Sequence, residues 1–388
     1  MMLAVFVSVI GAAAWVYLLA FRGVFWRFRE RDDGDAWVRC EAWPSVVAIV
    51  PARDEIETIE RSVSSLLAQD YPGEFRVLVV DDQSSDGTGP RAQALNSSGL
   101  GLEVLRGAEP PSGWTGKLWA MKQGVVHAGA AAPDYLWFTD ADIVHLPDNL
   151  RRLVVRAGKR RLVMVSLMAK LRCESFAEHF LIPAYVFFFA MLYPFSWVNR
   201  ASHTMAAAAG GCMLVDRAAL ERAGGIDSIK SEIIDDCALG RRMKQQGPIW
   251  LGLTERALSI RPYPHIGDIR RLIARSAYAQ LGYSPVVLLG TLAAMIAIYA
   301  APPFIALLGS GAARLAAGLS WLCMAAAFQP ILSFYRRSPL WGVALPLIGL
   351  FYAAFTVDSA IQFWRGRGGM WKGRFQTMTR QNERSGGT

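Results

Sequence analysis

Two aspartates separated by one residue follow an apolar run in this sequence. Asp140 and Asp142 end the segment YLWFTDAD (135–142), whose first residues predict a buried strand. Two carboxylates at this spacing can share one hard divalent cation with a diphosphate, because Mg²⁺ and Mn²⁺ prefer oxygen ligands. The alternative is a helix N-cap or a solvated loop. The metal interpretation therefore depends on whether other polar strand ends lie beside this pair.

Acidic residues also end two earlier predicted strands, in SVVAIVPARDE (45–55), which proline breaks, and in FRVLVVDD (75–82). These acids are Asp54, Glu55, Asp81 and Asp82. Since ligands bind at the carboxyl ends of parallel strands, we expect these side chains to meet the aspartate pair at one rim of a sheet. A carboxylate held there can accept hydrogen bonds from a nucleoside. The following Asp86-Gly87 predicts a turn.

Charged residues also lie at the starts of two predicted helices. Lys117 begins a helix over 116–129, where the helix dipole disfavours a cation, so a phosphate partner and an exposed lysine are the two interpretations. Asp235 and Asp236 precede an amphipathic helix within 231–247, where acids are also favoured simply by the dipole. A carboxylate in such a cleft could remove a proton from an acceptor hydroxyl.

Strands and helices alternate at short intervals to position these residues. Further strands are predicted at 102–107 and 162–170, and further helices at 57–69 and after Pro147. This alternation predicts an α/β fold with a mostly parallel, Rossmann-like sheet and flanking helices. The later segment 206–225 predicts a glycine turn, a short strand and a helix with Asp216 as its N-cap.

Four apolar runs flank this patterned section, at 3–21, 285–308, 313–335 and 339–364, in a chain that is 53% hydrophobic. Arginines follow the first run rather than precede it, which favours an anchor over a cleaved signal peptide. The positive-inside rule then places the next domain in the cytoplasm. We therefore expect a multi-pass protein of the inner (cytoplasmic) membrane, with N-terminal and C-terminal transmembrane helices and a cytoplasmic catalytic domain.

The basic charge and the remaining apolar segment bear on the membrane arrangement. The net charge of +9 lies largely near the membrane runs, which suits anionic lipid headgroups and not nucleic acid. Three crossings would leave the basic tail outside, against the positive-inside rule, unless one run is re-entrant or interfacial or the spans divide differently. The aromatic segment 180–198 is either interfacial or a buried core helix.

The predicted organisation has six parts. They are an anchor (1–22), a juxtamembrane linker (23–43), a catalytic domain (44–265), an interfacial helix (266–284), a C-terminal membrane region (285–365) and a basic tail (366–388). The cysteines Cys40, Cys173, Cys212, Cys237 and Cys323 have no paired spacing and predict free thiols. The sequence predicts no oligomeric state.

Six motifs occur in a specific order: PARDE, VVDDQSSDGT, WTGK, DAD, GGCMLVDRAALERAGG and IDDCALGRRMKQQG. In this order they resemble a family 2 glycosyltransferase of the GT-A fold over 44–283. The layout with membrane runs is similar to ceramide glucosyltransferase and to the bacterial group associated with hopanoid biosynthesis. The resemblance implies inverting, metal-dependent transfer of a sugar from a nucleotide-sugar donor to a membrane lipid, with Mg²⁺ or Mn²⁺ as cofactor.

The resemblance also implies roles for the matching residues. Substrate-binding contacts would come from Pro51, Glu55, Asp81, Asp82 and Lys117, with Glu55 and Asp82 at the nucleoside and Lys117 near the phosphates. Asp140 and Asp142 would bind metal and diphosphate, with Asp142 the direct ligand. Gly210 and Gly211 would lie beside the acceptor. Asp236 would be the catalytic base, with Asp235 in the position of the family's glutamate.

The chain departs from the family's QxxRW motif, because RRLIARSAYAQ (270–280) has Leu272 and Ser276 in place of the glutamine and tryptophan. Arg275 is the candidate substrate-binding arginine. The loss of the motif argues against the first alternative, a processive polysaccharide synthase. The intact Asp142 and Asp236 argue against the second, a non-catalytic membrane scaffold.

Two further segments have candidate roles. His265, in RPYPH, is either a metal or phosphate contact or a satisfied loop histidine. The tail segment MWKGR (370–374) resembles the end of lipid- and carotenoid-modifying relatives and would then have to be cytoplasmic.

Overall fold

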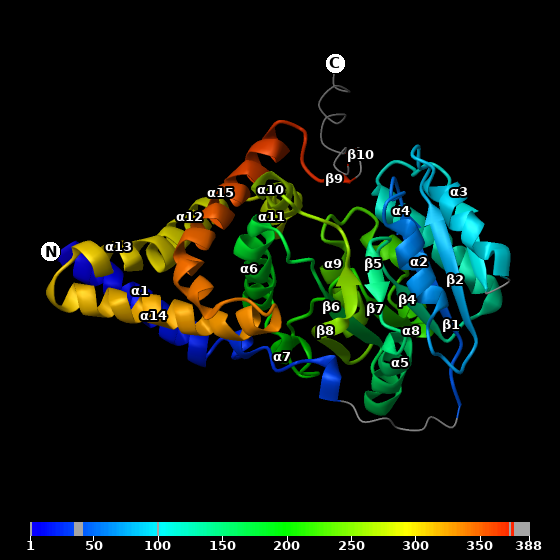
Figure 1. The fold of residues 1–388 in the computed structure, drawn as a ribbon, viewed down its shortest axis with the longest axis horizontal. Helices are drawn as coiled ribbons and strands as arrows, with labels where there is room; N and C mark the ends of the chain where they lie inside the picture. Colours follow the sequence, from blue (N-terminus) through cyan, green and yellow to red (C-terminus); the bar gives the residue numbers. More distant parts are fainter. Residues whose placement is uncertain (1, 35–41, 99–100, 372–373, 376–388) are drawn as a thin grey trace, which may run out of the picture. The chain divides into compact units, whose positions relative to one another are not determined.

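The computed structural model describes residues 2–34, 42–98, 101–371 and 374–375 (Figure 1). The chain divides into two compact units. One is helical and contains Met1–Arg29, Cys173–Ser196 and Pro262–Gly368, and the other is an α/β unit built mainly from Glu30–Arg172 and Trp197–Arg261. The segment Cys173–Ser196, which the sequence places inside the catalytic domain 44–265, thus belongs to the helical unit. Cys40, part of the predicted linker and most of the basic tail lie outside the described residues.

The α/β unit contains an eight-stranded sheet in the order β3-β2-β1-β4-β7-β6-β8-β5. Its strands are β1 (Val46–Ala52), β2 (Phe75–Asp81), β3 (Leu102–Arg106), β4 (Tyr135–Phe138), β5 (Ile143–His145), β6 (Met164–Lys170), β7 (Met213–Asp216) and β8 (Ile249–Ser259). The pairs β1-β2, β1-β4, β2-β3 and β6-β8 are parallel, and the three pairs that contain β7 or β5 are antiparallel. The predicted α/β fold with a mostly parallel sheet is confirmed, with a mixed second half.

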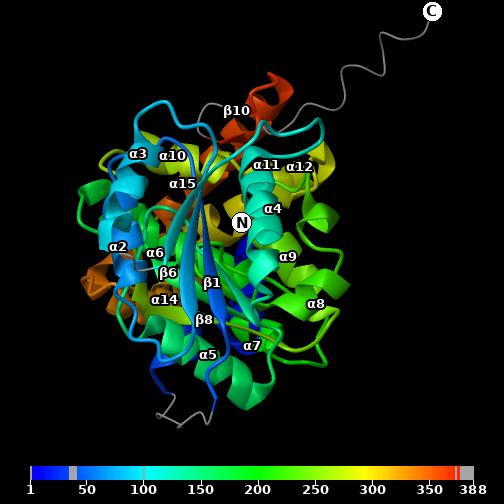
Figure 2. The same ribbon diagram turned by 90° about the vertical axis from the view of Figure 1, so that its right-hand side faces the viewer.

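Helices cover both faces of this sheet. They are α2 (Ile59–Leu67), α3 (Thr88–Gln93), α4 (Gly116–Ala128), α5 (Asn149–Arg160), α8 (Arg217–Arg222) and α9 (Asp235–Lys244). In Figure 2, α2 and α3 lie on one side of the sheet, and α4 and α9 lie on the other. The β-branched strand β1 is buried along its whole length between these layers, which fixes the rim where the acidic loops begin.

The strand β1 continues through Pro51, although the sequence predicted that proline ends it. Pro51 stays in register with Val80 of β2. Backbone groups alternate in direction along a strand, and the Ile49 carbonyl points toward β4, where it accepts from the amide of Thr139. The Pro51 nitrogen therefore also points to that side, beyond the last β1-β4 pair at Ile49 and Phe138, where no strand needs its missing hydrogen.

The helical unit contains the apolar segments predicted to be in the membrane. Its helices include α1 (Met2–Ala20), α6 (Phe176–Leu192), α10 (Ile266–Ala274), α11 (Ala277–Gln280), α12 (Pro285–Met295), α13 (Ala301–Leu308), α14 (Gly311–Phe334) and α15 (Leu345–Trp364). In the described part of the chain, three helical stretches are long and apolar enough to cross a membrane: Pro285–Leu308, Gly311–Phe334 and Pro339–Trp364. They match the predicted C-terminal runs, whereas α1 and α6 are shorter apolar helices.

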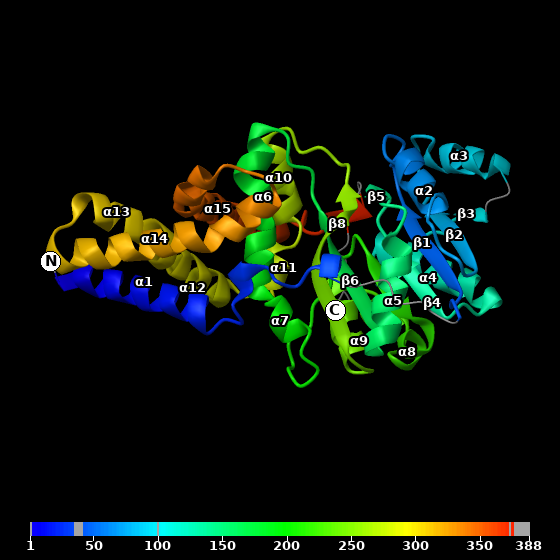
Figure 3. The same cartoon turned by 60° about the horizontal axis from the view of Figure 1, so that its bottom comes forward.

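Small residues line the contact between α1 and α14, which lie side by side in Figures 1 and 3. On α14, Ala313, Ala317 and Ser320 are buried at helical spacing. On α1, a Cβ atom added at Gly11 would lie 3.7 Å from Ser320 Oγ. Helices in lipid associate through such close packing of small residues, and α1 and α14 pack against each other in this way.

The helix α6 covers most of the segment 180–198, for which the sequence left two interpretations. Most of its residues are buried, including Phe180, Phe187 and Glu178. Its neighbours in the helical unit are α10, α14 and α15. The packing matches the second alternative, a buried helix. Its depth relative to a bilayer stays a prediction.

The short helical turn before α15 folds back along α14. The side-chain amide of Gln329 donates to the carbonyl of Pro339 at 3.1 Å, and the indole N–H of Trp321 donates to the carbonyl of Val343 at 3.0 Å. Because later residues of the turn meet earlier residues of α14, this segment runs antiparallel to α14 before α15 begins.

The end of α15 lies beside the start of α12. The ring of Tyr283, which precedes α12, stacks on Phe363 with centroids 4.4 Å apart. The amide of Tyr278 donates to Ser359 Oγ at 3.0 Å. Leu288 of α12 packs in the same cluster. The first and the last candidate spans therefore meet at one end of the helical unit.

Candidate functional site

The aspartate pair lies in the turn between β4 and β5, since β4 stops at Phe138 and not at Asp142. The side chain of Asp140 is 35% exposed, whereas that of Asp142 is 13% exposed. Asp142 Oδ2 accepts hydrogen bonds from Arg261 Nε at 2.8 Å and from Ser259 Oγ at 3.4 Å. Burial raises the pKa of Asp142, and the guanidinium of Arg261 opposes that rise. The pair thus presents one accessible and one enclosed carboxylate.

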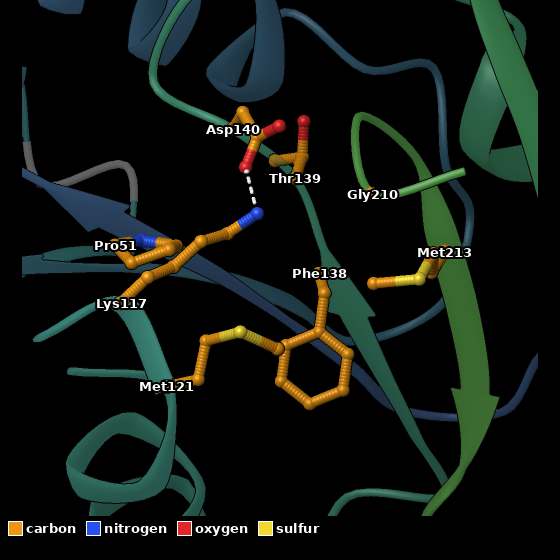
Figure 4. Close-up of a pocket in the computed structure, with 8 residues that line it drawn as sticks. All are labelled: Pro51, Lys117, Met121, Phe138, Thr139, Asp140, Gly210 and Met213. Carbon is orange, nitrogen blue, oxygen red and sulfur yellow. Dashed lines mark ion pairs between the residues drawn. The ribbon is translucent and has the colours of Figure 1, made fainter. Parts of the chain in front are cut away.

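Lys117 connects the aspartate pair with the acids at the start of α9. It lies in the first turn of α4, which is capped by Thr115. Its Nζ is 2.9 Å from Asp140 Oδ1, as Figure 4 shows, and 3.1 Å from Asp235 Oδ2. Burial lowers the pKa of Lys117, but the surrounding carboxylates raise it further, so the ammonium group stays charged. The interpretation of Lys117 as an exposed lysine is therefore wrong, because its side chain is only 17% exposed.

Asp236 is held in the first turn of α9 by two backbone amides. Its Oδ2 accepts from the Gly210 amide at 3.0 Å, and its Oδ1 accepts from the Cys237 amide at 2.7 Å. Burial and the adjacent charge of Asp235 raise the pKa of Asp236 to about 6, against the opposing effects of Lys117 and the two amides. A carboxylate with this pKa can exchange protons near neutral pH.

The glycine loop before β7 approaches this cluster closely. A Cβ atom added at Gly210 would lie 3.4 Å from Lys117 Nζ and 3.6 Å from Asp236 Oδ2. At Gly211 a Cβ atom would lie 3.1 Å from the Cβ of Ala169. The loop therefore brings the backbone at Gly210 against the charged cluster, where a side chain would crowd Lys117 and Asp236.

A buried polar chain, which was not predicted from the sequence, joins the aspartate turn to the glycine loop. Thr139 Oγ1 donates to the Gly211 carbonyl at 2.9 Å and lies 2.8 Å from His145 Nε2. Asn149 Nδ2 lies 2.9 Å from His145 Nδ1. Burial lowers the pKa of His145 to about 3, so its ring is neutral. These bonds fix the two loops relative to each other.

Glu55 lies at the same rim, in the loop after β1. Its Oε2 accepts from Thr58 Oγ1 at 3.0 Å, and its amide donates to Thr88 Oγ1 at 2.8 Å. Its Oε1 accepts from Arg261 Nη2 at 2.5 Å. Arg261 thus joins Glu55 to Asp142. Arg261 was not among the residues predicted from the sequence, although it lies in the same RPYPH segment as His265.

The acids after β2 differ in their surroundings. The side chain of Asp82 is fully buried. The backbone carbonyl of Asp82 accepts a hydrogen bond from Arg53 Nη1 at 2.5 Å. Asp81 Oδ1 accepts from the Ser84 amide at 3.0 Å and so supports the following turn. Gly87 has a φ of +95°, in agreement with the turn predicted at Asp86-Gly87.

The structure places the predicted site residues in both units. The α/β unit brings Lys117, Asp140, Gly210, Asp235 and Asp236 into one cluster and joins Glu55 to Asp142. Arg275 follows α10 in the helical unit, and His265 precedes that helix. The His265 amide donates to Asp268 Oδ2 at 2.9 Å, at the start of that helix.

A small pocket lies against the charged cluster (Figure 4). Its charged side is formed by Lys117 and Asp140, and its apolar side by Met121, Phe138 and Met213. Pro51, Thr139 and Gly210 complete the lining. This space is too small to admit even a water molecule, so in this conformation it holds no ligand.

Two family models match the chain. The model described as "Glycosyl transferase family 2" matches residues 47–224. The model described as "Glycosyl transferase family group 2" matches residues 139–357, which is more than half of the chain. Together they cover most of the α/β unit and part of the helical unit.

Two curated relatives match shorter segments. Succinoglycan biosynthesis protein ExoO of Rhizobium meliloti is 33% identical over 114 residues, which are 29% of this chain and 30% of the relative. Glycosyltransferase AglE of Haloferax volcanii is 36% identical over 63 residues, which are 16% of this chain and 21% of the relative. The matched segments therefore span less than a third of either relative.

One solved structure resembles nearly the whole chain. The mannosyltransferase PcManGT from Pyrobaculum calidifontis, solved in complex with GDP-Man and Mn²⁺, has a TM-score of 0.56 and 19% sequence identity. The match covers 93% of this chain and 99% of PcManGT. This likeness confirms the expected GT-A fold.

Proposed function

The chain belongs to the family 2 glycosyltransferases, and we propose that it transfers a sugar from a nucleotide-sugar donor to the hydroxyl group of a membrane lipid, with inversion at the anomeric carbon. The observation that carries this proposal is the position of Lys117 between Asp140 and the acids of α9. In this position the ammonium group of Lys117 lies beside Asp140, where the diphosphate of the donor is proposed to bind. The carboxylates of α9 lie on the other side of Lys117, where the acceptor hydroxyl is proposed to bind. PcManGT, which shares the fold, was solved with a sugar nucleotide and Mn²⁺.

Asp236 is the proposed general base. Its carboxylate takes the proton of the acceptor hydroxyl while the hydroxyl oxygen bonds to the anomeric carbon, and the bond from that carbon to the diphosphate breaks on the opposite face. Lys117 offsets the charge that develops on the leaving diphosphate. The Gly210 amide, which donates to Asp236 Oδ2, keeps the base oriented.

A divalent metal ion fits the aspartate turn. The described residues contain no group of three or more His, Cys, Asp or Glu that could hold a metal alone. Asp140 and Asp142 supply hard oxygen ligands, and Mg²⁺ usually takes its remaining ligands from phosphate and water. Bound there, Mg²⁺ or Mn²⁺ would neutralise charge on the diphosphate.

The pH dependence of the reaction should reflect Asp236. Since only the carboxylate accepts a proton and its pKa is raised from 3.8 to about 6, kcat/KM should rise with pH through about 6 and then level off. Below that pH, kcat/KM should fall about tenfold per pH unit. The measurement is kcat/KM from about pH 4.5 to pH 8. Asp235→Asn removes a charge that raises the pKa and should move the midpoint to lower pH, whereas a flat profile would contradict the assignment.

Donor binding is the direct test of the proposed function. Thermal stability of the purified protein should be measured with UDP-, GDP- and dTDP-sugars, with and without Mn²⁺. A donor at a hundred times its Kd should stabilise the native state by about 2.7 kcal/mol. One donor class should therefore raise the melting temperature, and more strongly with Mn²⁺. No shift with any donor would contradict the nucleotide-sugar reaction.

The alternative function, which we favour less, is that of a processive polysaccharide synthase. The residues Leu272 and Ser276, which replace the motif that holds a growing chain in processive relatives, support single transfer. A product-length assay distinguishes the two, since single transfer gives one sugar per lipid and a synthase gives a polymer.

We propose that the last apolar run, 339–364, is re-entrant and does not cross the membrane. Its support is the turn that folds back along α14 and the contact of Phe363 with Tyr283 at the start of α12. The basic tail would then lie on the same side as α10, which removes the conflict with the positive-inside rule. Single cysteines at the exposed positions His265 and Arg367, in a cysteine-free background, should react with an impermeant maleimide from the same side. Reaction from opposite sides would show three full crossings.

A further inference from the structure

One arginine bridges two carboxylates that have different proposed roles. Arg261 Nε lies 2.8 Å from Asp142 Oδ2, and its Nη2 lies 2.5 Å from Glu55 Oε1. The side chains of Glu55 and Asp142 are only 10% and 13% exposed, whereas that of Arg261 is 29% exposed. The guanidinium therefore reaches from a more accessible position into an enclosed acidic pair, 206 residues from Glu55 along the chain.

The proposed metal ion and Arg261 would bind the same oxygen of Asp142. Enclosed carboxylates need a partner cation, because burial of an unpaired charge is costly. Asp142 Oδ2, which would bind the metal, already accepts a charge-assisted hydrogen bond from Arg261. A divalent cation at the same oxygen would have to displace the guanidinium and would be repelled by its charge while it remains.

We propose that Arg261 is an internal cation that competes with the divalent metal for Asp142 and holds Asp142 to Glu55 when donor and metal are absent. The inference rests on the proposed function for the role of Asp142, and on the nucleoside contact that the family resemblance implies for Glu55. It implies that the metal binds weakly to the donor-free protein. Because Arg261 also bonds Glu55, a nucleoside that engages Glu55 weakens the bridge and so makes Asp142 more available to the metal.

A second arginine in the same unit provides a matched control. Arg256 also bridges two carboxylates, with Nη1 3.3 Å from Asp32 Oδ1 and Nε 3.1 Å from Asp148 Oδ2. Its side chain is 19% exposed, and neither of its partners belongs to the proposed site. Loss of Arg256 therefore removes a comparable bridge without freeing a proposed metal ligand.

The test is Mn²⁺ binding to the full-length protein in detergent without nucleotide, measured from free Mn²⁺ by electron paramagnetic resonance. Arg261→Met should bind Mn²⁺ about fivefold more tightly than the native protein or better, because a charge-assisted competitor is gone. Arg256→Met should leave the Kd unchanged. Asp142→Asn should weaken binding in both the native and the Arg261→Met backgrounds. An Arg261→Met Kd equal to or weaker than the native one would overturn the proposal.

Arg261→Lys covers the case in which Arg261→Met does not fold. An ammonium group cannot form the two-pronged bridge, so this variant should also bind Mn²⁺ more tightly than the native protein. An unchanged Kd would again overturn the proposal. Donor-induced thermal shifts, measured on the same samples, distinguish a failure of the Arg261 proposal from a failure of the proposed function. If donors bind but Arg261 variants leave the Kd for Mn²⁺ unchanged, only this inference fails; if no donor binds any variant, the proposed function fails.

Discussion

Asp236→Asn is expected to lower kcat for sugar transfer by about a thousandfold while the affinity for the donor persists. The amide of asparagine has nearly the shape of the carboxylate but cannot accept the proton of an attacking hydroxyl. Its oxygen can replace only one of the two acceptors that now bind the amides of Gly210 and Cys237. The measurement is the initial rate with a lipid acceptor, together with donor-induced thermal stabilisation.

Asp216→Asn is the matched control for this substitution. Asp216 Oδ1 caps α8 by accepting from the Ala219 amide at 2.6 Å, and asparagine is an equally good N-cap. This variant should therefore keep native activity. An Asp236→Asn enzyme within a few-fold of native kcat would show that another group removes the proton, and Asp235, 3.1 Å from Lys117, would be the next candidate.

The sequence predicted the first half of the sheet well because its signals are local. Buried β-branched runs such as β1 need no partner to be recognised as strands. Ligands bind at the carboxyl ends of parallel strands, and this rule predicted from the sequence alone that Glu55 and Asp142 lie at one rim of the sheet. The structure confirms their proximity through the shared bridge of Arg261.

The contacts that the sequence did not predict join distant segments. The antiparallel insertion of β7 between β4 and β6 depends on strand pairing, which no local pattern encodes. Arg261 meets Glu55 across 206 residues, and a single arginine after a strand carries no signal of its own. The chain from Asn149 through His145 to Thr139 is buried, and a lone histidine in a sequence is usually just part of the core.

Composition alone also did not decide the packing of the apolar helices. A helix that is apolar on all sides, such as α6, suits both a membrane interface and a helical core. The fold-back at Pro339 and the contact of Phe363 with Tyr283 come from tertiary packing. Hydropathy therefore predicted the positions of the C-terminal runs but not which end of the unit the last one reaches.

Asp142→Asn is expected to lower kcat by about a hundredfold to a thousandfold and to abolish stimulation by Mn²⁺ at concentrations that saturate the native enzyme. Asp140→Asn should have the smaller effect, because Asp140 is the more accessible carboxylate and Lys117 stays nearby to neutralise phosphate. Arg261 keeps Glu55 as a partner in the Asp142 variant, so the fold should persist. Activity should be titrated with Mn²⁺ for both variants. Native stimulation of Asp142→Asn would place the metal elsewhere and would remove the reason for Arg261 to compete with it.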